Sequence, residues 1–254
     1  MSRIAPLLHS KPLADTATRV AGLTDWYRQQ APLVVLDHAL RAPGSGRVAL
    51  VSSFGAEAVV LLHMVSQIDR HTPVLFLDTE MLFPETLAYQ HEIAVKFQLS
   101  DLRAIQARKE DLDQHDPDGE LHKIATDACC ALRKTRPLAR ALRDFDGWIT
   151  GRKRFHGGAR ASLDIFEAEP GTGRIKINPL AHWRPEDVLS YVETHDLPRH
   201  PLVARGYPSI GCMPCTSPAK QDEDPRAGRW RGNKKTECGI HFDKGRATRT
   251  GASA

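Results

Sequence analysis

The chain has 254 residues, of which 41% are hydrophobic, and 35 lysines and arginines face 31 aspartates and glutamates. This size and balance predict one sizeable α/β domain and exclude a fibrous or wholly disordered protein. The longest apolar runs, at residues 58–62 and 74–77, are far too short to cross a bilayer. The first sixteen residues have too weak an apolar block for a secretory signal. We therefore expect a cytoplasmic protein without membrane association.

Short apolar runs alternate with helix-like segments along most of the chain. Strands and core segments are predicted at 48–51, 74–77, 102–105, 148–150 and 175–180, with one short strand within 157–173. Helices are predicted at 58–68, 84–97, 127–143 and 185–195, after one or two in the first forty residues. This alternation favours a single Rossmann-like α/β domain with a mostly parallel sheet covered on both faces. Ligands of such sheets bind beyond the carboxyl ends of the strands.

The end of the chain differs in composition from the rest. Proline, glycine and charged residues dominate from residue 198 onward. Residues 219–254 hold nine basic and five acidic residues, so this stretch alone accounts for the formal net charge of +4. A solvated end explains this charge, and an anionic partner is the alternative. We expect an α/β domain over residues 1–218 and a flexible C-terminal segment over residues 219–254.

A hydroxyl-rich turn, S-S-F-G-A-E at residues 52–57, joins a predicted strand to a predicted helix. Backbone N–H groups at the start of a helix can hold a phosphate. Serine and glycine are also ordinary cap and turn residues, so the turn alone is a weak signal. It lacks the G-K-[ST] sequence of a P-loop, which makes a kinase or GTPase of that class an unlikely assignment.

Five cysteines form a four-plus-one pattern. Cys129 and Cys130 are adjacent, and Cys212 and Cys215 form a C-x-x-C pair, which together predict a metal site with four thiolates. Neighbouring residues on a helix point about 100° apart, which suits a multi-iron cluster better than a single tetrahedral ion. Spacing alone nevertheless leaves zinc and an iron–sulfur cluster about equally supported. Lys134 shares the cysteines' helix face, where it either offsets negative charge or is simply solvated.

The fifth cysteine, Cys238, is the strongest candidate for a nucleophile. Nearby cations lower the pKa of a thiol, and Lys234, Lys235 and His241 are close to Cys238 in sequence. Gly239 leaves the thiol sterically open on one side. The alternative is a spare surface cysteine, which this basic setting disfavours.

Eight segments carry a resemblance to a known family. They are SSFGAE at 52–57, LDTEMLFPET at 77–86, CCALRKTRPL at 129–138, TGRKRFHGGAR at 150–160, INPLAHW at 177–183, GCMPCT at 211–216, RAGRW at 226–230 and ECGIH at 237–241. In this order they resemble the adenosine 5′-phosphosulfate (APS) reductases of bacterial sulfate assimilation. These enzymes are relatives of the phosphoadenosine phosphosulfate (PAPS) reductases and have the adenine-nucleotide α-hydrolase-like fold.

The resemblance implies a role for each candidate residue. Those around the nucleotide would be Ser52, Ser53, Gly55, Glu57, Leu77, Thr79 and Arg160. Those that grip the phosphosulfate would be Lys134, Arg226, Arg229 and His241. Cys238 would be the catalytic cysteine on a mobile segment. The other four, Cys129, Cys130, Cys212 and Cys215, would hold a 4Fe–4S cluster, which PAPS-specific relatives generally lack.

The reaction implied is thiol-dependent reduction of APS to sulfite and AMP, in assimilatory sulfate reduction for cysteine biosynthesis. The Cys238 thiolate would attack the sulfur of APS, AMP would leave, and an S-sulfonate would remain on the cysteine. A thioredoxin or glutaredoxin-like dithiol would then release sulfite. The sequence leaves the oligomeric state open, a homo-oligomer included.

Three alternatives are weighed against this reading. One is PAPS reduction by the same chemistry. Another is an ATP-splitting ligase or adenylyltransferase of the same fold, which would require a Ser-Gly-Gly-x-Asp-Ser loop where residues 53–58 read S-F-G-A-E-A. The third is a zinc-stapled nucleic-acid-binding protein, but its basic tail offers only Trp230 and Phe242 for base stacking. We therefore expect no nucleic-acid partner.

Overall fold

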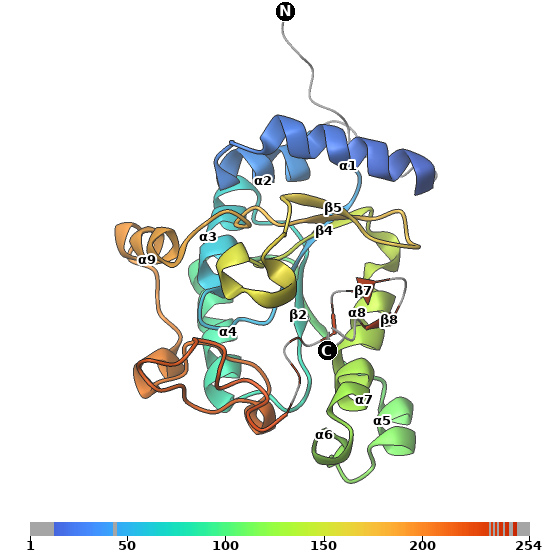
Figure 1. Cartoon of the computed structure of the whole chain (residues 1–254), viewed down its shortest axis with the longest axis vertical. Coiled ribbons are helices and arrows are strands. Elements are labelled where there is room, and N and C mark those ends of the chain that lie inside the picture. Colours follow the sequence, from blue (N-terminus) through green and yellow to red (C-terminus); the bar gives the residue numbers. More distant parts are fainter. Residues whose placement is uncertain are drawn as a thin grey trace, which may run out of the picture.

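The computed structural model describes residues 13–42, 45–233, 235, 237, 239–240, 242–243 and 246–247. A six-stranded sheet lies at its centre, in the order β3-β2-β1-β4-β6-β5 (Figure 1). The strands are β1 Val48–Ser52, β2 Val74–Leu77, β3 Leu102–Ile105, β4 Gly147–Ile149, β5 Phe166–Ala168 and β6 Ile175–Ile177. All neighbouring strands are parallel except β5, which pairs antiparallel with β6 at the edge. The predicted fold class is therefore confirmed.

Helices cover both faces of the sheet. They are α1 Leu13–Tyr27, α2 Pro32–Arg41, α3 Ala58–Ile68, α4 Pro84–Lys96, α5 Lys109–His115, α6 Leu121–Ile124, α7 Thr126–Cys130, α8 Arg136–Ala141 and α9 Pro185–Thr194. Figure 1 shows α3, α4 and α9 on one side of the strands and α5 to α8 on the other. A small antiparallel pair, β7 Phe242–Asp243 and β8 Arg246–Ala247, follows near the end of the chain.

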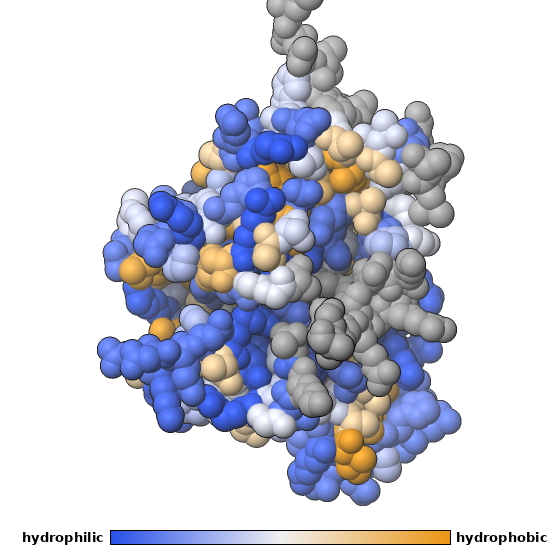
Figure 2. Space-filling view, viewed as in Figure 1, coloured by the Kyte–Doolittle hydropathy of each residue, from blue (hydrophilic) through white to orange (hydrophobic). Residues whose placement is uncertain are grey.

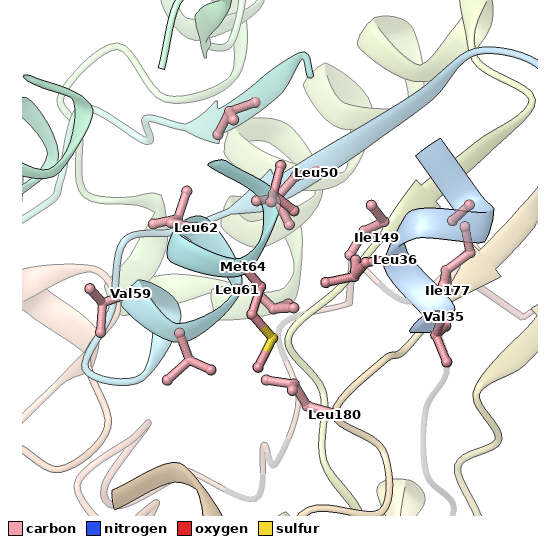
Figure 3. Close-up of a cluster of buried hydrophobic side chains, with 14 of the residues drawn as sticks. Val35, Leu36, Leu50, Val59, Leu61, Leu62, Met64, Ile149, Ile177 and Leu180 are labelled. Carbon is pink, nitrogen blue, oxygen red and sulfur yellow. The ribbon is translucent and has the colours of Figure 1, made fainter. Parts of the chain in front are cut away.

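The two faces of the sheet bury alternate residues of the same strands. In β1, Leu50 belongs to a large core with α2 and α3, whereas Ala49 and Val51 belong to a smaller core with α8. Figure 3 shows the larger core, in which Leu50 and Leu62 lie on adjacent elements. Burial on both faces explains why these strands read as continuous apolar runs. On the surface of Figure 2, hydrophilic residues predominate and hydrophobic ones form small separate patches.

The predicted helix over residues 127–143 is interrupted. A π-helical turn, Ala131–Thr135, separates α7 from α8, and a 3₁₀ turn, Leu142–Asp144, ends the run. Pro137 gives the physical reason, because inside a regular α-helix its ring would clash with the carbonyl four residues earlier and leave one hydrogen bond unmade. The wider π turn accommodates this and rotates the residues within it. It places Arg133 and Lys134 in buried positions.

Two helices were absent from the prediction. Helices α5 and α6 have no buried residues and are only seven and four residues long, so they present no apolar face to recognise. In the part of the chain that the structure describes, no helix is long and apolar enough to cross a membrane.

Residues after 218 pack on the loop that carries the C-x-x-C pair. The Trp230 N–H donates to the Cys215 carbonyl oxygen (3.0 Å), and the Ser217 N–H donates to the Gly228 carbonyl oxygen (2.9 Å). The Trp230 side chain is almost fully buried. The division into an α/β domain and a C-terminal segment at residue 218 remains a prediction.

Candidate active site

A cavity of about 510 Å³ opens beyond the carboxyl ends of β1, β2 and β4. It brings together ten of the eleven residues that the sequence assigned to substrate binding: Ser52, Ser53, Gly55, Glu57, Leu77, Thr79, Lys134, Arg160, Arg226 and Arg229. The eleventh, His241, and the candidate nucleophile Cys238 lie outside the described residues. The side chains that line the cavity come from segments far apart in the sequence, and the parallel sheet gathers them at one edge.

The turn after β1 has a fixed and strained backbone. The Ser52 hydroxyl accepts a hydrogen bond from the Phe54 N–H (3.1 Å), and Phe54 has a φ of 49°, in the left-handed region. Such a conformation in a bulky residue is held by its surroundings, here complete burial and an edge-on contact with Phe76. Gly55 leaves room for the Ile210 carbonyl oxygen, which would lie only 3.3 Å from a Cβ. The turn therefore presents its N–H groups in a preset arrangement beside the start of α3.

Glu57 ends this turn in an ion-pair network. Its carboxylate accepts a hydrogen bond from Lys153 (2.7 Å) and lies 3.3 Å from His156. Burial alone would raise the pKa of Glu57, but His156 and Lys153 outweigh it and lower that pKa to about 2. Lys153 is 2% exposed, and its ammonium also donates to the Gly151 carbonyl oxygen (3.1 Å). Glu57 is therefore ionised at neutral pH and fixes the loop after β4.

The cavity wall is strongly basic. Among the residues that the structure describes, six cations line it against one acidic residue, Glu57, and they are Lys134, Arg152, Lys153, Arg160, Arg226 and Arg229. Four of these have an acidic partner close by, because Arg152 pairs with Glu167, Lys153 with Glu57, and both Arg160 and Arg226 with Glu237. The excess of positive charge suits a ligand that carries several negative charges.

Arg229 is held so that part of its guanidinium remains available. Its Nη1 donates to the Ile210 carbonyl oxygen (3.2 Å), and its Cζ lies 4.5 Å from the centre of the Trp230 ring. Its Nε is buried and has no hydrogen-bond partner among the residues that the structure describes. Gly211 makes room for the guanidinium, because a Cβ there would overlap its Nη2. A buried donor of this kind at a cavity wall is suited to an anionic acceptor.

Arg160 is occupied by groups of the chain itself. Its Nε and Nη2 donate to the two carboxylate oxygens of Glu237 (2.6 and 2.7 Å), and its Nη1 donates to His156 Nδ1 (3.1 Å). Arg226 Nη2 lies 3.5 Å from the same Glu237 carboxylate. The residue that directly precedes Cys238 in sequence is thus anchored among the cavity arginines.

The four remaining cysteines approach one another from two elements. Cys129 and Cys130 are buried at the end of α7, and Cys212 and Cys215 flank a 3₁₀ turn, Met213–Cys215. Cys212 lines the main cavity, whereas Cys215 lines a second cavity of about 490 Å³. Within the described residues, no group of three or more His, Cys, Asp or Glu side chains is arranged to hold a metal ion.

Three side chains connect the two cysteine pairs. The Thr79 hydroxyl lies within hydrogen-bond distance of Cys212 Sγ (3.2 Å), and the Thr79 carbonyl oxygen accepts from Arg133 (3.0 Å). Arg133, in the π turn after the first pair, also donates twice to the buried carboxylate of Asp116 (2.8 and 3.1 Å). Lys134 forms a hydrogen bond with Cys212. The π turn therefore holds Arg133 against Asp116 and Thr79 and directs Lys134 toward Cys212.

The thiols of the two pairs influence one another. Burial raises the pKa of Cys129 to about 12, and the neighbouring Cys130 and the more distant Cys212 add to this increase. Burial also opposes ionisation of Cys212, but Lys134 outweighs it and lowers the pKa of that thiol. Cys129 and Cys212 therefore lie close enough to interact, although 83 residues separate them in sequence.

Four residues at the site were not among the predicted set. Arg152, Lys153 and His156 lie within the T-G-R-K-R-F-H segment that follows β4, and Glu237 lies beside the predicted nucleophile. The position of the first three at a strand end could have identified them. The role of Glu237 could not be found in this way, because its partner Arg160 is 77 residues distant.

Comparison with known proteins places this site in a family. Residues 47–218 match the family model described as phosphoadenosine phosphosulfate reductase domain. The whole chain is 46% identical to the adenosine 5′-phosphosulfate reductase of Mesorhizobium japonicum, covering 99% of that protein. Over 92% of its length the chain is 37% identical to the phosphoadenosine 5′-phosphosulfate reductase of Gloeobacter violaceus, covering 99% of that protein. The crystal structure of phosphoadenylyl-sulfate reductase from Candida auris, in a phosphate complex, superposes with a TM-score of 0.67 at 26% identity, covering 79% of this chain and 97% of that one.

Proposed function

The chain belongs to the phosphoadenosine phosphosulfate reductase family, and we propose that it reduces APS to sulfite and AMP at the expense of a dithiol. One structural observation gives this proposal its main support. The cavity gathers six cations at the carboxyl edge of the sheet, and the residue before Cys238 is anchored among them. This supports a site at which a nucleotide anion and the thiol of Cys238 would meet.

Different residues of the cavity would bind different parts of the substrate. The N–H groups of the turn at residues 52–57 would bind the phosphate, with Leu77 and Thr79 near the base. Arg229, with its buried and unpaired Nε among the described groups, would donate to the phosphosulfate. Lys134 and Arg226 line the same wall, and His241 would join them. Cations fixed in this way stabilise the negative charge that builds up on AMP as it leaves.

The chemistry proceeds in two steps. The Cys238 thiolate attacks the sulfur of APS, and an S–S bond forms as the bond from sulfur to the AMP phosphate oxygen breaks. AMP leaves with the electron pair, and an S-sulfocysteine remains. One thiolate of a thioredoxin or glutaredoxin-like dithiol then attacks the cysteine sulfur, forms a mixed disulfide with Cys238 and releases sulfite. The second thiol of the dithiol attacks this mixed disulfide, regenerates the Cys238 thiol and leaves the reductant as a disulfide, which accounts for the two electrons of the reduction.

We favour APS over its 3′-phosphorylated analogue as the substrate. The 46% identity to an APS reductase over the whole chain and the presence of two cysteine pairs support this choice. PAPS remains a second candidate, because the relative from Gloeobacter violaceus is named for it. Equal concentrations of both nucleotides in one reaction would decide, and a higher kcat/KM for PAPS would reverse the assignment while leaving the chemistry intact.

We infer that the four remaining cysteines hold a 4Fe–4S cluster. They supply the four thiolates that such clusters require, and the electrostatic influence of Cys212 on the Cys129 thiol supports this inference. Cys129, Cys130, Cys212 and Cys215 would hold the cluster, which would supply a charged centre beside the substrate. Lys134, bonded to Cys212 and lining the cavity, would lie between cluster and substrate and balance the charge of both.

The cluster assignment is tested by the purified protein itself. Protein prepared without air should be brown, with broad visible absorbance and with iron and acid-labile sulfide in equal amounts. Stoichiometric zinc without iron or sulfide would show that the four thiolates hold a single ion instead.

Trapping the intermediate tests the reaction. Incubation of the holoenzyme with APS and no reductant should leave a sulfonate on the peptide that carries Cys238, and thioredoxin should discharge it as sulfite. Cys238→Ser should abolish sulfite formation by roughly 10³-fold or more, because a serine hydroxyl stays protonated at neutral pH. It should retain the visible spectrum and AMP binding. An adduct on another cysteine, or turnover by the serine variant, would mean that the nucleophile lies elsewhere.

A further inference from the structure

His156 lies on the loop after β4, between a carboxylate and a guanidinium. Its Nε2 is 3.3 Å from a carboxylate oxygen of Glu57, and its Nδ1 is 3.1 Å from Arg160 Nη1. The side chain is 15% exposed, and its ring packs edge-on against Phe155. The imidazole therefore joins the turn at residues 52–57 to an arginine of the cavity wall.

These neighbours determine which form of the imidazole is present. A guanidinium has donors alone, so Nδ1 accepts from Arg160 and carries no proton. The Glu57 carboxylate is ionised at neutral pH and has acceptors alone, so Nε2 carries the proton. Burial, together with the charges of Lys153 and Arg160, lowers the pKa of His156 although Glu57 acts in the opposite direction. His156 is therefore neutral at pH 7, and a second proton can enter only at Nδ1, where it would face Arg160.

The orientation of Arg160 depends on His156 as well as on Glu237. Glu237 accepts from Nε and Nη2 of the guanidinium, and His156 accepts from Nη1. A guanidinium carries five N–H donors, so these three bonds leave one N–H on each terminal nitrogen for a ligand. The Arg160 side chain lines the cavity, where such a ligand would bind. His156 fixes the end of the guanidinium that Glu237 does not reach, and the plane of the group is set by both.

The turn between His156 and Arg160 depends on two glycines. Gly157 and Gly158 have φ angles of 66° and 56°, in the left-handed region that other residues rarely adopt. A Cβ at either position would meet no atom of the described residues within 4 Å, so backbone conformation and not a lack of space calls for glycine. The Arg160 N–H closes the turn by donating to the Gly157 carbonyl oxygen (3.1 Å). This backbone brings the His156 and Arg160 side chains into contact.

We propose that His156 is a positioning residue of the active site, which as a neutral imidazole aligns Arg160 toward the nucleotide anion and loses this alignment when it binds a second proton. This inference rests on the proposed binding of a sulfonucleotide in the cavity. A proton on Nδ1 would set one donor against another and place a further cation beside Lys153 and Arg160. Affinity for the anion should therefore fall in acid, although the cavity becomes more positive.

Substitution of His156 by glutamine separates alignment from titration. The glutamine side-chain oxygen can accept from Arg160 and its N–H can donate to Glu57, but the amide does not titrate. Leucine removes both hydrogen bonds. At about pH 7.5, AMP should bind His156→Gln within about twofold of wild type and His156→Leu about tenfold more weakly, as expected for the loss of a hydrogen bond to a charged group. Titration calorimetry of the holoenzymes with AMP measures these affinities.

The pH dependence of AMP binding distinguishes positioning from a merely structural role. Between about pH 7.5 and pH 5, wild type should lose at least about threefold more affinity than His156→Gln. Comparing the two proteins at each pH cancels the ionisation of the AMP phosphate, which affects both alike. The ring ¹⁵N signals that are missing from His156→Gln report the state of His156 directly. They should show an Nε2–H imidazole at pH 7.5, and the extra loss of affinity should follow their titration.

The matched control is His63→Gln. His63 is also partly buried, burial lowers its pKa, and its Nδ1 bonds with the Tyr191 hydroxyl (2.9 Å). It does not line the cavity, so this variant should keep the AMP affinity of wild type at every pH. Circular dichroism and the visible spectrum of each variant show whether it is folded and loaded.

The outcomes separate this inference from the proposed function. A wild type that binds AMP as expected but forms no sulfonate adduct from APS would refute the reaction and leave the alignment of Arg160 standing. AMP affinity that is the same in wild type and His156→Leu, or as weak in His156→Gln as in His156→Leu, would refute the positioning role alone. Affinity of wild type that rises in acid relative to His156→Gln would show that the imidazolium serves as an additional cation, which would also overturn the assignment.

Discussion

The predicted phosphate-binding turn and Glu237, the residue before Cys238, are held beside the cavity by different means. The turn at residues 52–57 continues β1 directly, and its backbone is fixed by the sheet, by buried Phe54 and by the Ser52 hydroxyl. Among the described residues near Cys238, Glu237 is held by an ion pair with Arg160, in which the two side chains are 19% and 11% exposed. The predicted phosphate-binding turn is therefore part of the core, whereas Glu237 is held by side-chain contacts between segments that are distant in the sequence.

Loss of one of the four cysteines proposed to hold the cluster should have the largest effect, and it should lower activity far more than AMP binding. Cys212→Ser should remove the visible absorbance and lower activity by at least about 10²-fold, because the serine cannot replace a thiolate ligand and the charge balance at Lys134 is altered. AMP affinity should fall much less, since the turn after β1 does not depend on the cysteines. Equilibrium binding of AMP beside the steady-state rate would measure this. A loss of binding as large as the loss of rate would show that the cluster supports the whole cavity.

A methyl group at Gly211 should displace the Arg229 guanidinium at the cavity wall and leave the turn at residues 52–57 unchanged. Gly211→Ala would place a Cβ against the Arg229 guanidinium and displace it, and kcat/KM should fall about 10- to 100-fold, as expected for a misplaced charged group. Gly151→Ala is the control, because it also adds a methyl to the cavity wall but the nearest atom, Leu61 Cδ1, is 3.7 Å away. Equal effects of the two substitutions would show that cavity volume matters here and the placement of Arg229 does not.

The sequence predicts the strands and the turn at residues 52–57 better than it predicts contacts between distant segments. Strands β2 and β3 occupy the predicted residues, and the turn at 52–57 lies at the cavity as expected, because apolar runs and strand ends are local signals. The approach of Cys129 to Cys212 and the pairing of Glu237 with Arg160 depend on contacts between distant segments. No local pattern encodes them. The π turn is an intermediate case, because Pro137 is visible in the sequence but the way in which the helix absorbs it is not.

The ion pair that fixes the nucleotide turn should appear in the acid stability of the protein. Glu57 has a pKa of about 2 in the folded chain against 4.5 ordinarily, so its contribution is complete above about pH 4.5 and is lost as the pH falls toward 2. The contribution is about 3 kcal/mol, from a difference of roughly 2.5 pKa units. Urea unfolding of wild type and Glu57→Gln between pH 6 and 3 would measure it. The wild-type advantage should shrink on acidification, and a constant difference would show that the carboxylate charge is not its source.

A second effect on stability should come from Lys176, a buried cation on the sheet rather than at the cavity. It lies in β6 and is 5% exposed, with its ammonium 5.1 Å from the centre of the Trp148 ring. Burial, with a smaller contribution from Arg152, lowers the pKa of Lys176 from 10.5 to about 8. Because the unfolded chain binds this proton more tightly, the free energy of unfolding should rise as the pH increases from about 8 to about 10.5. The increase has an upper limit of about 3 kcal/mol.

Lys176→Met should remove this dependence, because methionine fills a similar volume without a charge. At pH 7 the variant should be about 1 to 3 kcal/mol more stable than wild type, and the difference should vanish by about pH 10.5. Arg184→Met, on an exposed side chain, serves as the control and should change stability by less than about 0.5 kcal/mol at both pH values. Adduct formation should be unaffected, since Lys176 belongs to the rigid sheet and makes no contact with the Cys238 segment among the residues that the structure describes. A Lys176→Met variant that is less stable at pH 7 would show that the contact with Trp148 outweighs the cost of burying the charge.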